Sequence, residues 1–440
     1  MNDIADVSTA AIGIIENAGD KMHSFIADLF PICRSITGQG TVETLRRIQK
    51  VIPIRIVAVA SGTPVYDWTV PDEWNIRDAY IKDSTGKRIV DFRKNNLHVL
   101  NYSVPVRATL SLNELEPHLH SLPGLPDVIP YRTTYYKKDW GFCLTHNQLE
   151  GLDENETYEV CIDATLQPGH MHYGELVIPG SSEEEVLIST HVCHPSMCND
   201  NLSGIAVATF LAKSLMSTDV RYTYRFLFLP ATIGAITWLS INEKNTGKIR
   251  HGLVAALLGD DAPFTYQRTR LGNSEIDRVV EYLLRNDRRN RCYDFVPYGY
   301  DQRQFCSPGF NLPVGTLTRS LYGEYPEYHT SADNLDFVKP RALQGSLSLY
   351  QKVVSILEGN LHYINTHPKT EPQLGRRGLY AQVGGTTHKN HLQMAMLWTL
   401  NFSDGNHSLL DIATRSGIPF EDLAIAAARL CETDLLKTKL

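Results

Sequence analysis

The chain has 440 residues, of which 42% are hydrophobic and 21% are charged, and its formal net charge is −7. A chain of this length and composition can bury more than one core, so we expect two or three globular domains. The negative balance disfavours a protein that coats nucleic acid, and no apolar run approaches the ~20 residues of a membrane-spanning helix. The first 20 residues contain acids but no basic segment, which predicts a cytoplasmic protein without a signal peptide.

Eight cysteines are scattered through the chain, and none lies in a C-x-x-C pair. This spacing favours reduced thiols rather than a disulfide framework, as expected for a cytosolic protein. Cys193 and Cys198 are the exceptions to consider as metal ligands, because they flank the histidines described below.

The N-terminal third changes character along its length. Two helices are predicted at about residues 22–36 and 41–51, followed from about 55 to 132 by proline, tryptophan and short alternating runs. In that stretch residues 79–82 and 88–92 flank Asp83-Ser84-Thr85-Gly86, a pattern typical of a β-hairpin. We therefore expect a small β-rich module here, with a further strand at 157–166.

From residue 176 onward strands and helices alternate. Such alternation predicts an α/β fold, with a mainly parallel sheet covered by helices on both faces. The predicted strands are 186–190, 222–229, 253–258 and 292–295, and the predicted helices are 203–216, 234–245, 274–286 and 342–358.

The C-terminal part has a different composition. Residues 366–390 are rich in Pro, Gly, Thr and Lys and are typical of a linker. Three helical runs follow at about 391–400, 408–415 and 419–431, and Gly417 between the last two indicates a helix-turn-helix.

The strongest functional signal lies between residues 186 and 211. The apolar run Val186-Leu187-Ile188 predicts a buried strand, which would deliver His191 and His194 at its carboxyl end, where ligands collect in open α/β sheets. Asp200 follows in the loop before an apolar helix. Two imidazoles and a carboxylate suit a zinc ion. Alternatively, the histidines are ordinary polar loop residues, and Asp200 belongs to a turn with a helix N-cap.

Further candidate residues follow later strands. Asp260 comes directly after the predicted strand 253–258, and His329 lies among Glu324, Glu327 and a further acid. Arg303 stands two residues after another acid. Each signal alone is weak, because acidic loops are usually solvated, but their recurrence at successive strand ends favours a metal site.

With these residues in view, the chain resembles the co-catalytic zinc aminopeptidases. It is more similar still to a bacterial family of aminopeptidase-like proteins that carry a β-rich insertion and a C-terminal winged helix. The matching phrases are Asp67-Trp68-Thr69-Val70-Pro71, Thr190 to Pro195, Asn199 to Gly204, Cys306 to Gly315 and Tyr328 to Ser331. The resemblance implies an aminopeptidase-like domain from residues 1–54 and 133–365, an insertion at 55–132, and a linker with a winged helix at 366–440.

The resemblance also implies roles for the candidate ligands. Asp200 would bridge two metal positions, with His191 and Asp260 completing one of them and His329 serving the other. His194 is expected in the same pocket. The cofactor implied is zinc.

The sequence departs from such aminopeptidases directly after the predicted strand 222–229. They have two adjacent glutamates there, a general base and then a metal ligand, whereas this chain has Pro230-Ala231-Thr232. Alanine cannot accept a proton, and a threonine hydroxyl is a poor zinc ligand. We therefore expect one zinc ion to bind well and a second to be doubtful.

The expected function is a zinc-dependent hydrolase acting on an amide bond of a peptide or small biosynthetic intermediate. Glu327 or Glu324 would replace the missing base, and Arg303 would hold a substrate carboxylate or an oxyanion. Plainer interpretations are solvent exposure of Glu327 and a structural ion pair of Arg303 with Asp301 or Asp294. The rival function is a non-catalytic scaffold that binds a protein partner or a second copy of the chain.

The charge of the tail bears on nucleic-acid binding. From Asp404 to Leu440 six acids outnumber four bases, and the would-be recognition helix opens with Glu421 and Asp422. A DNA-reading helix presents hydrogen-bond donors to bases and phosphates instead. We therefore predict no nucleic-acid or membrane partner, and a winged helix that packs against its own enzyme or another protein.

Overall fold

The computed structural model describes residues 12–379 and 387–439. Its central layer is an eight-stranded mixed sheet. The strand order is β1 (Arg55–Ala60), β10 (His170–Ile178), β12 (Thr223–Leu229), β11 (Glu185–His191), β13 (Ile249–Ala255), β16 (Val314–Thr318), β14 (Thr265–Gln267) and β15 (Arg291–Tyr293). Strands β12, β11, β13 and β16 are parallel to one another, whereas β1 and β10 extend one edge in antiparallel fashion.

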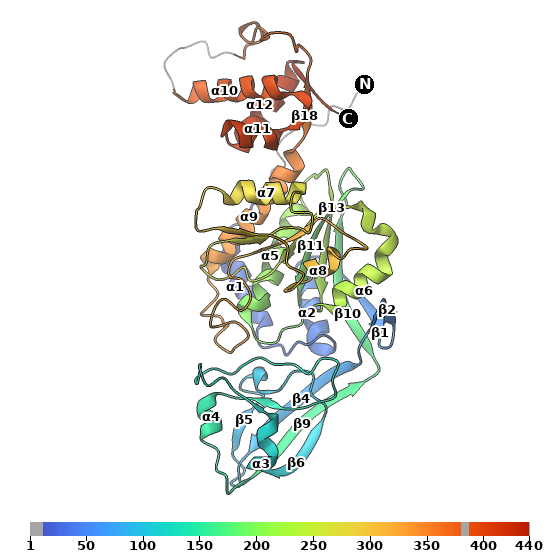
Figure 1. Cartoon of the computed structure of the whole chain (residues 1–440), viewed down its shortest axis with the longest axis vertical. Coiled ribbons are helices and arrows are strands. Elements are labelled where there is room, and N and C mark those ends of the chain that lie inside the picture. The colour runs from blue at the N-terminus through green and yellow to red at the C-terminus, as the bar shows by residue number, and fades with distance from the viewer. Residues whose placement is uncertain (1–11, 380–386, 440) are drawn as a thin grey trace.

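Helices cover both faces of this sheet, as the alternating pattern predicts (Figure 1). One face is covered by α1 (Ala18–Leu29), α2 (Gln39–Gln49), α5 (Gly204–Leu215), α7 (Glu275–Leu284) and α9 (Pro340–Gly359), and the other by α6 (Ile233–Asn242) and α8 (Gln302–Phe305). The expected fold class is therefore confirmed. No helix among residues 12–379 and 387–439 is both long and apolar enough to cross a membrane.

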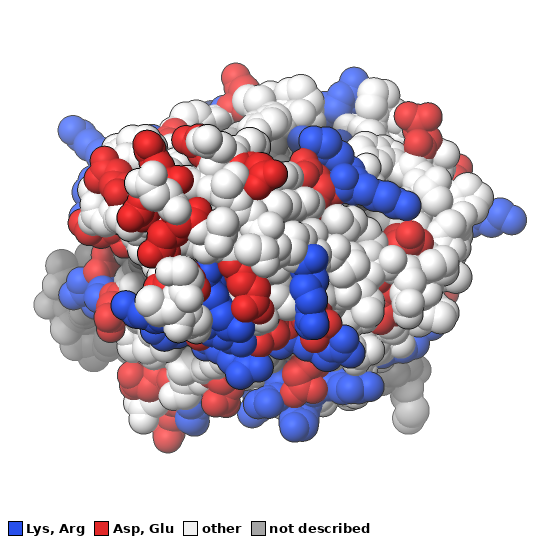
Figure 2. Space-filling view, turned by 90° about the horizontal axis from the view of Figure 1, so that it is seen from below, with Lys and Arg blue, Asp and Glu red and all other residues white. Residues whose placement is uncertain are grey.

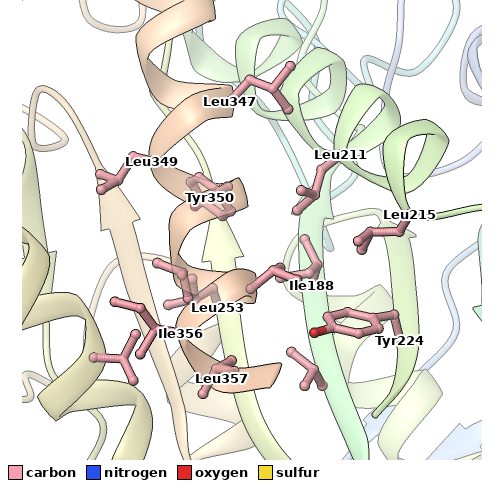
Figure 3. Packing of buried hydrophobic residues seen from close by; sticks show 14 of the residues in the cluster. Ile188, Leu211, Leu215, Tyr224, Leu253, Leu347, Leu349, Tyr350, Ile356 and Leu357 are labelled. Carbon is pink, nitrogen blue, oxygen red and sulfur yellow. The ribbon is translucent and has the colours of Figure 1, made fainter. Parts of the chain in front are cut away.

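The core explains the apolar run Val186-Leu187-Ile188 within β11. Every residue of β11 is buried, because both of its faces are covered. Ile188 meets Leu211 of α5, Leu253 of β13 and Tyr350 of α9 in one cluster (Figure 3). Full burial of such a side chain stabilises the fold by about 1.5–3 kcal/mol, so this cluster fixes the strand that ends at His191.

A buried ion-pair network crosses the sheet on its other face. Arg225 of β12 contacts Glu175 of β10 and Glu185 of β11, each at 2.6 Å. The indole N–H of Trp238 on α6 also donates to Glu175, at 3.1 Å. The network therefore links three adjacent strands to α6.

Some strands lie outside the predicted boundaries. The predicted strand 253–258 is observed as β13, Ile249–Ala255. It ends before residue 258 because Leu257 has a φ of 51°, far from the φ of about −120° to −140° in β-strands. The polar start of β13 belongs to the strand because it pairs with β11. Strands β10, β14 and β16 follow no pattern that we recognise in the sequence.

A second sheet forms the lower part of the molecule in Figure 1. It contains β5 (Arg88–Asp91), β4 (Glu73–Lys82), β9 (Thr157–Gln167) and β6 (Val106–Ser111), all antiparallel. The β4–β5 pair is the predicted hairpin. Both signs of charge occur on this end (Figure 2), and some pair across strands, as Arg77 does with Asp163 at 2.6 Å. The module also contains β7 (Leu119–His120), β8 (Phe142–Cys143), α3 (Leu112–Leu115), α4 (His146–Glu150) and the helical turns η1 (Asn96–His98) and η2 (Glu116–His118). The hairpin of β2 (Pro64–Val65) and β3 (Trp68–Thr69) lies beside α6 instead (Figure 1).

The pairing bears on the domain boundaries, which remain a proposal. Strand β1 lies within the expected insertion at 55–132 but pairs with β10 of the large sheet. Strand β9 lies beyond that range but joins β4 and β6. Strand pairing therefore favours an insertion that begins after β1 and ends between β9 and β10.

The C-terminal part forms a separate small body at the opposite end of the molecule from the insertion (Figure 1). It contains the turn η5 (Gly375–Arg377), the helices α10 (Thr387–Phe402), α11 (Leu409–Ser416) and α12 (Phe420–Glu432), and a three-stranded sheet of β18 (Asp404–Ser408), β17 (His362–Asn365) and β19 (Leu436–Thr438). This part contacts α7. The Phe420 N–H donates to the Tyr282 hydroxyl at 2.9 Å, and Arg278 pairs with Asp411.

Candidate metal centre

The candidate ligands come from two connections at the carboxyl edge of the sheet. His191 is the last residue of β11, and His194 lies in the loop that follows. Asp200 lies in the irregular turn η3 (Cys198–Ser203), which leads into α5. His329 comes from the long connection between β16 and α9 and adopts a left-handed φ of 54°. Residues far apart in the sequence thus meet at the edge where α/β folds bind ligands.

The three histidines surround the carboxylate of Asp200. His191 Nε2 lies 2.9 Å from Asp200 Oδ1, and His329 Nε2 lies 2.9 Å from Oδ2. His194 Nε2 is 3.8 Å from Oδ2. Ligand atoms of His191, His194 and Asp200 all lie within 4.8 Å of one another. Ligand atoms about 2.0–2.1 Å from a tetrahedral zinc ion lie roughly 3.3 Å apart, and the separations of 2.9 and 3.8 Å from Asp200 to His191 and His194 lie on either side of that value.

The protonation states of this cluster also suit a metal. Burial alone would raise the pKa of Asp200, but His194 together with hydrogen bonds from His191 and His329 holds that pKa well below its usual value. Burial lowers the pKa of His194 well below that of a free imidazole. A carboxylate and a neutral imidazole are the forms that bind zinc. The donor set therefore fits a zinc ion in chemistry and in spacing.

Neighbouring groups hold the ligand loops in place. The Asp333 carboxylate accepts the backbone N–H groups of Asn199 and Asp200, at 2.5 and 2.8 Å. The Tyr131 N–H donates to the His329 carbonyl at 2.7 Å. The Tyr131 ring lies 5.1 Å from both His194 and His329, between centroids. The segment that carries Tyr131 therefore forms one wall of the centre.

Asp260 does not join the cluster. Its Oδ2 accepts a hydrogen bond from the Asn199 side-chain amide at 2.7 Å, and its Oδ1 accepts the Ala262 N–H at 2.7 Å. Because Asn199 immediately precedes Asp200, this hydrogen bond from Asn199 to Asp260 stabilises the turn that carries Asp200. The structure brings His194, rather than Asp260, next to His191 and Asp200.

The segment after β12 presents no carboxylate. The Ala231 N–H donates to the Cys193 sulfur at 3.4 Å, and that sulfur lies 3.2 Å from His194 Nδ1. Burial raises the pKa of Cys193 to about 12. All eight cysteines lie in described segments and are free.

The residues predicted to assist catalysis lie in differing surroundings. Glu324 is exposed and pairs with Arg291 at 2.8 Å. Glu327 is half-buried, and its backbone carbonyl accepts hydrogen bonds from Thr330. The guanidinium of Arg303 lies 5.8 Å from the centre of the Tyr298 ring, and its Nε has no hydrogen-bond partner.

Two further residues border the centre. The Tyr300 ring stacks on His191 with centroids 5.8 Å apart and planes inclined by 23°, and its buried hydroxyl has no hydrogen-bond partner. Asp301 is buried, and its Oδ1 also has no partner. Burial raises the pKa of Asp301 to about 6, against the opposing charges of His191 and Arg303. In the sequence, the only indication that Tyr300 and Asp301 belong to the site is that they lie next to Arg303.

The fold and the ligand cluster define the class as an aminopeptidase-like α/β protein with a C-terminal winged helix. A family model described as a domain of unknown function (DUF4910) matches residues 23–360, and one described as a winged helix-turn-helix matches residues 361–438. The chain is 51% identical over 420 residues to a "Putative polysaccharide biosynthesis protein with aminopeptidase-like domain" from Clostridium acetobutylicum, covering 95% of this chain and 96% of that protein. The chain belongs to the DUF4910 family.

Solved structures agree with this assignment. The crystal structure of a putative peptidase from Clostridium acetobutylicum has 50% sequence identity and a TM-score of 0.91, covering 96% of this chain and 97% of that one. BSAP, a zinc aminopeptidase from Bacillus subtilis, has a TM-score of 0.55 at 14% identity and covers 76% of this chain and 94% of that one. The second likeness establishes the fold alone.

Proposed function

We propose that this protein is a zinc-dependent, aminopeptidase-like hydrolase that cleaves an amide bond. The observation that carries the proposal is the convergence of three histidines on the buried Asp200 carboxylate at the carboxyl edge of the sheet. One zinc ion would be held by His191, His194 and Asp200. His329 lies on the other oxygen of Asp200 and would hold the same ion or a weaker second one.

A bound zinc ion supplies Lewis-acid activation of water and of a substrate carbonyl. The remaining steps belong to the protein. Tyr300 and Arg303 each present a polar atom without a hydrogen-bond partner, and both are suited to donate to an oxygen of the substrate.

A proton acceptor is required, and Ala231 cannot serve. Of the acids in the described part of the chain, Asp301 combines burial with an unpartnered oxygen, and it directly follows Tyr300, whose ring stacks on His191. We infer that Asp301 accepts the proton at Oδ1. Glu327 remains the alternative acceptor, because it lies two residues before His329.

The substrate we propose is a small amide-bearing intermediate rather than a protein. The Clostridium acetobutylicum relative, which this chain matches over nearly its whole length, is named for polysaccharide biosynthesis. A sugar precursor that carries an amide-linked substituent would agree both with that name and with the aminopeptidase-like fold, because it contains an amide bond to cleave.

Metal analysis of protein purified without chelator tests the site. We expect about one zinc ion per chain, and loss of most of it in His191→Ala and in His194→Ala, since each variant removes a ligand of that ion. The matched control is His407→Ala, which removes a tail imidazole 3.1 Å from Asp404. Protein that takes up no zinc when it is added, or whose zinc survives both substitutions, would contradict the proposal.

One observation favours a second function. The absence of a carboxylate at Ala231 suits a non-catalytic metal-binding scaffold that uses its insertion or tail to bind a partner. If the protein is such a scaffold, we expect full zinc occupancy and no hydrolysis of any amide tested, in the wild type and in the Ala231→Glu variant alike.

A further inference from the structure

A cavity of about 610 Å³ shares none of its lining residues with the candidate metal centre. Its walls are the β2–β3 hairpin, helix α6 and the loop that follows α8. Two phrases that carry the family resemblance meet here, because Trp68 belongs to residues 67–71 and Phe310 to residues 306–315. The metal centre uses neither phrase.

The lining combines aromatic rings with groups that form hydrogen bonds. Tyr66 and Trp68 are large apolar side chains with exposed fractions of 52% and 46%, and Phe310 packs edge-on against Tyr66 with centroids 6.0 Å apart. Asp67 and Glu243 supply carboxylates, and Gln304 and Ser307 supply amide and hydroxyl groups. This mixture of donors and acceptors beside exposed rings suits a ligand with an apolar face and several hydroxyls.

The hairpin holds one of these rings at a conformational cost. Val65 pairs with Trp68, so Tyr66 and Asp67 form a two-residue turn. Tyr66 has a φ of 56°, a conformation that glycine or asparagine adopts more easily. The Tyr66 hydroxyl donates to Glu243 on the opposite wall at 2.9 Å. The turn thus presents a tyrosine across the cavity mouth where a smaller residue would be less strained.

The charges at the cavity restrict the ligand class. Two carboxylates line the cavity, and no Lys or Arg is among the described residues that line it. A phosphate or carboxylate ligand would meet repulsion there. A simple ammonium ion would use the rings and acids but not the donors of Gln304 and Ser307, because it has no acceptor. A neutral sugar has both hydroxyl donors and acceptors.

We propose that this cavity is a binding site for a neutral saccharide unit. Two helices that line the cavity, α6 and α8, begin close in sequence to residues that border the metal centre. Helix α6 starts two residues after Ala231, and Gln304 lies three residues after Asp301. At about 1.5 Å per residue, Ile236 and Leu239 line the cavity only roughly 5–9 Å along α6 from its first residue. That the bound saccharide belongs to the hydrolysed substrate rests on the proposed function; the binding itself does not.

Calorimetric titration of the full chain with N-acetylglucosamine and its β-1,4-linked dimer tests the site. Trp68→Ala removes an exposed ring. Gly309→Trp fills the cavity without a backbone clash, because a Cβ at Gly309 meets no atom within 4 Å. We expect each variant to weaken saccharide binding by at least about tenfold. Gly124→Trp is the matched control, since Gly124 is equally open but lies outside the cavity, and its affinity should equal that of the wild type.

Three results would overturn the proposal. They are no saccharide binding at tens of millimolar, binding that both cavity variants leave unchanged, and binding of tetramethylammonium in preference to either sugar. Zinc content is measured on the same samples. Saccharide binding without zinc would refute the proposed function and leave this site standing, whereas zinc and amide hydrolysis without saccharide binding would do the reverse.

Discussion

Ala231 is the residue at which chemistry and family resemblance disagree. Its methyl group offers no proton acceptor, and its N–H is already bonded to the sulfur of Cys193 beside His194. If the centre lacks only a base, Ala231→Glu should raise amide hydrolysis at least ~10-fold, a cautious figure below the usual 10²–10⁴ of a general base. Ala231→Gln is the control, since it has a similar size but accepts no proton. Equal gains in both variants would show that side-chain bulk, and not a base, is responsible.

For Asp301 we expect a substitution to lower amide hydrolysis, the opposite of the effect expected at Ala231. If it already accepts the proton, Asp301→Asn should lower amide hydrolysis by about 10²–10⁴-fold. Zinc content should not change, because Asp301 is not placed among the ligands. Glu327→Gln should then have little effect, and Ala231→Glu should add little. Loss of activity in Glu327→Gln with activity retained in Asp301→Asn would assign the role to Glu327 instead.

At the residue scale, the sequence predicted the candidate ligands well where their spacing along the chain alone brings them together. His191, His194 and Asp200 lie within ten residues at a strand end, and the structure places them together. Asp260 was less predictable, because its carboxylate is drawn to the Asn199 amide, a contact that depends on the folded turn. Tyr300 and Asp301 gain their character from stacking and burial, which no local pattern encodes.

At the scale of elements, the network around Arg225 is the clearest test of how the sheet is held. Removing one partner of a buried ion pair leaves an uncompensated charge, so Arg225→Ala should destabilise the protein by about 3–5 kcal/mol. Arg77→Ala breaks the exposed pair with Asp163 and should destabilise the protein far less. Urea unfolding followed by circular dichroism measures both. Equal losses in the two variants would contradict this account.

Element prediction succeeded where burial is two-sided and failed where partners are distant. Strands β11 and β12 each contain a short apolar run, so their sequences indicate them. Strand β10 mixes histidines with apolar residues, and β14 is three residues long, so neither has a clear period. The pairing of β1 with β10 joins residues more than a hundred positions apart, and no local signal reports it.

At the scale of the whole molecule, the tail and the metal centre lie at opposite ends of the sheet. The tail contacts the end of α9 and helix α7, through Asn360 with Leu410 and Tyr282 with Phe420. The insertion side instead reaches the centre, because Tyr131 bonds to the backbone of His329. We therefore expect the insertion, and not the winged helix, to govern access of substrate to the centre.

The position of α12 bears on DNA binding by the tail. In helix-turn-helix proteins the first residues of the recognition helix enter the major groove. Here α12 begins at Phe420, which is 1% exposed and donates its N–H to Tyr282 of the main domain. Glu421 and Asp422 follow in the first turn and would repel phosphates. The start of this helix is therefore occupied by a contact within the chain and carries the wrong charge for DNA.

We predict that the protein shows no more than non-specific affinity for duplex DNA at physiological salt, with a Kd no tighter than about 10⁻⁶ M. Fluorescence anisotropy with a labelled random-sequence duplex and a set of candidate operators measures this. The double variant Glu421→Lys, Asp422→Lys replaces two acids with two bases, so its binding should strengthen and weaken again as salt is added, which shows that the assay can detect a gain. Nanomolar, salt-sensitive binding by the wild type that disappears when residues 391–440 are deleted would contradict the prediction, and would mean that the tail separates from α7 to present α12.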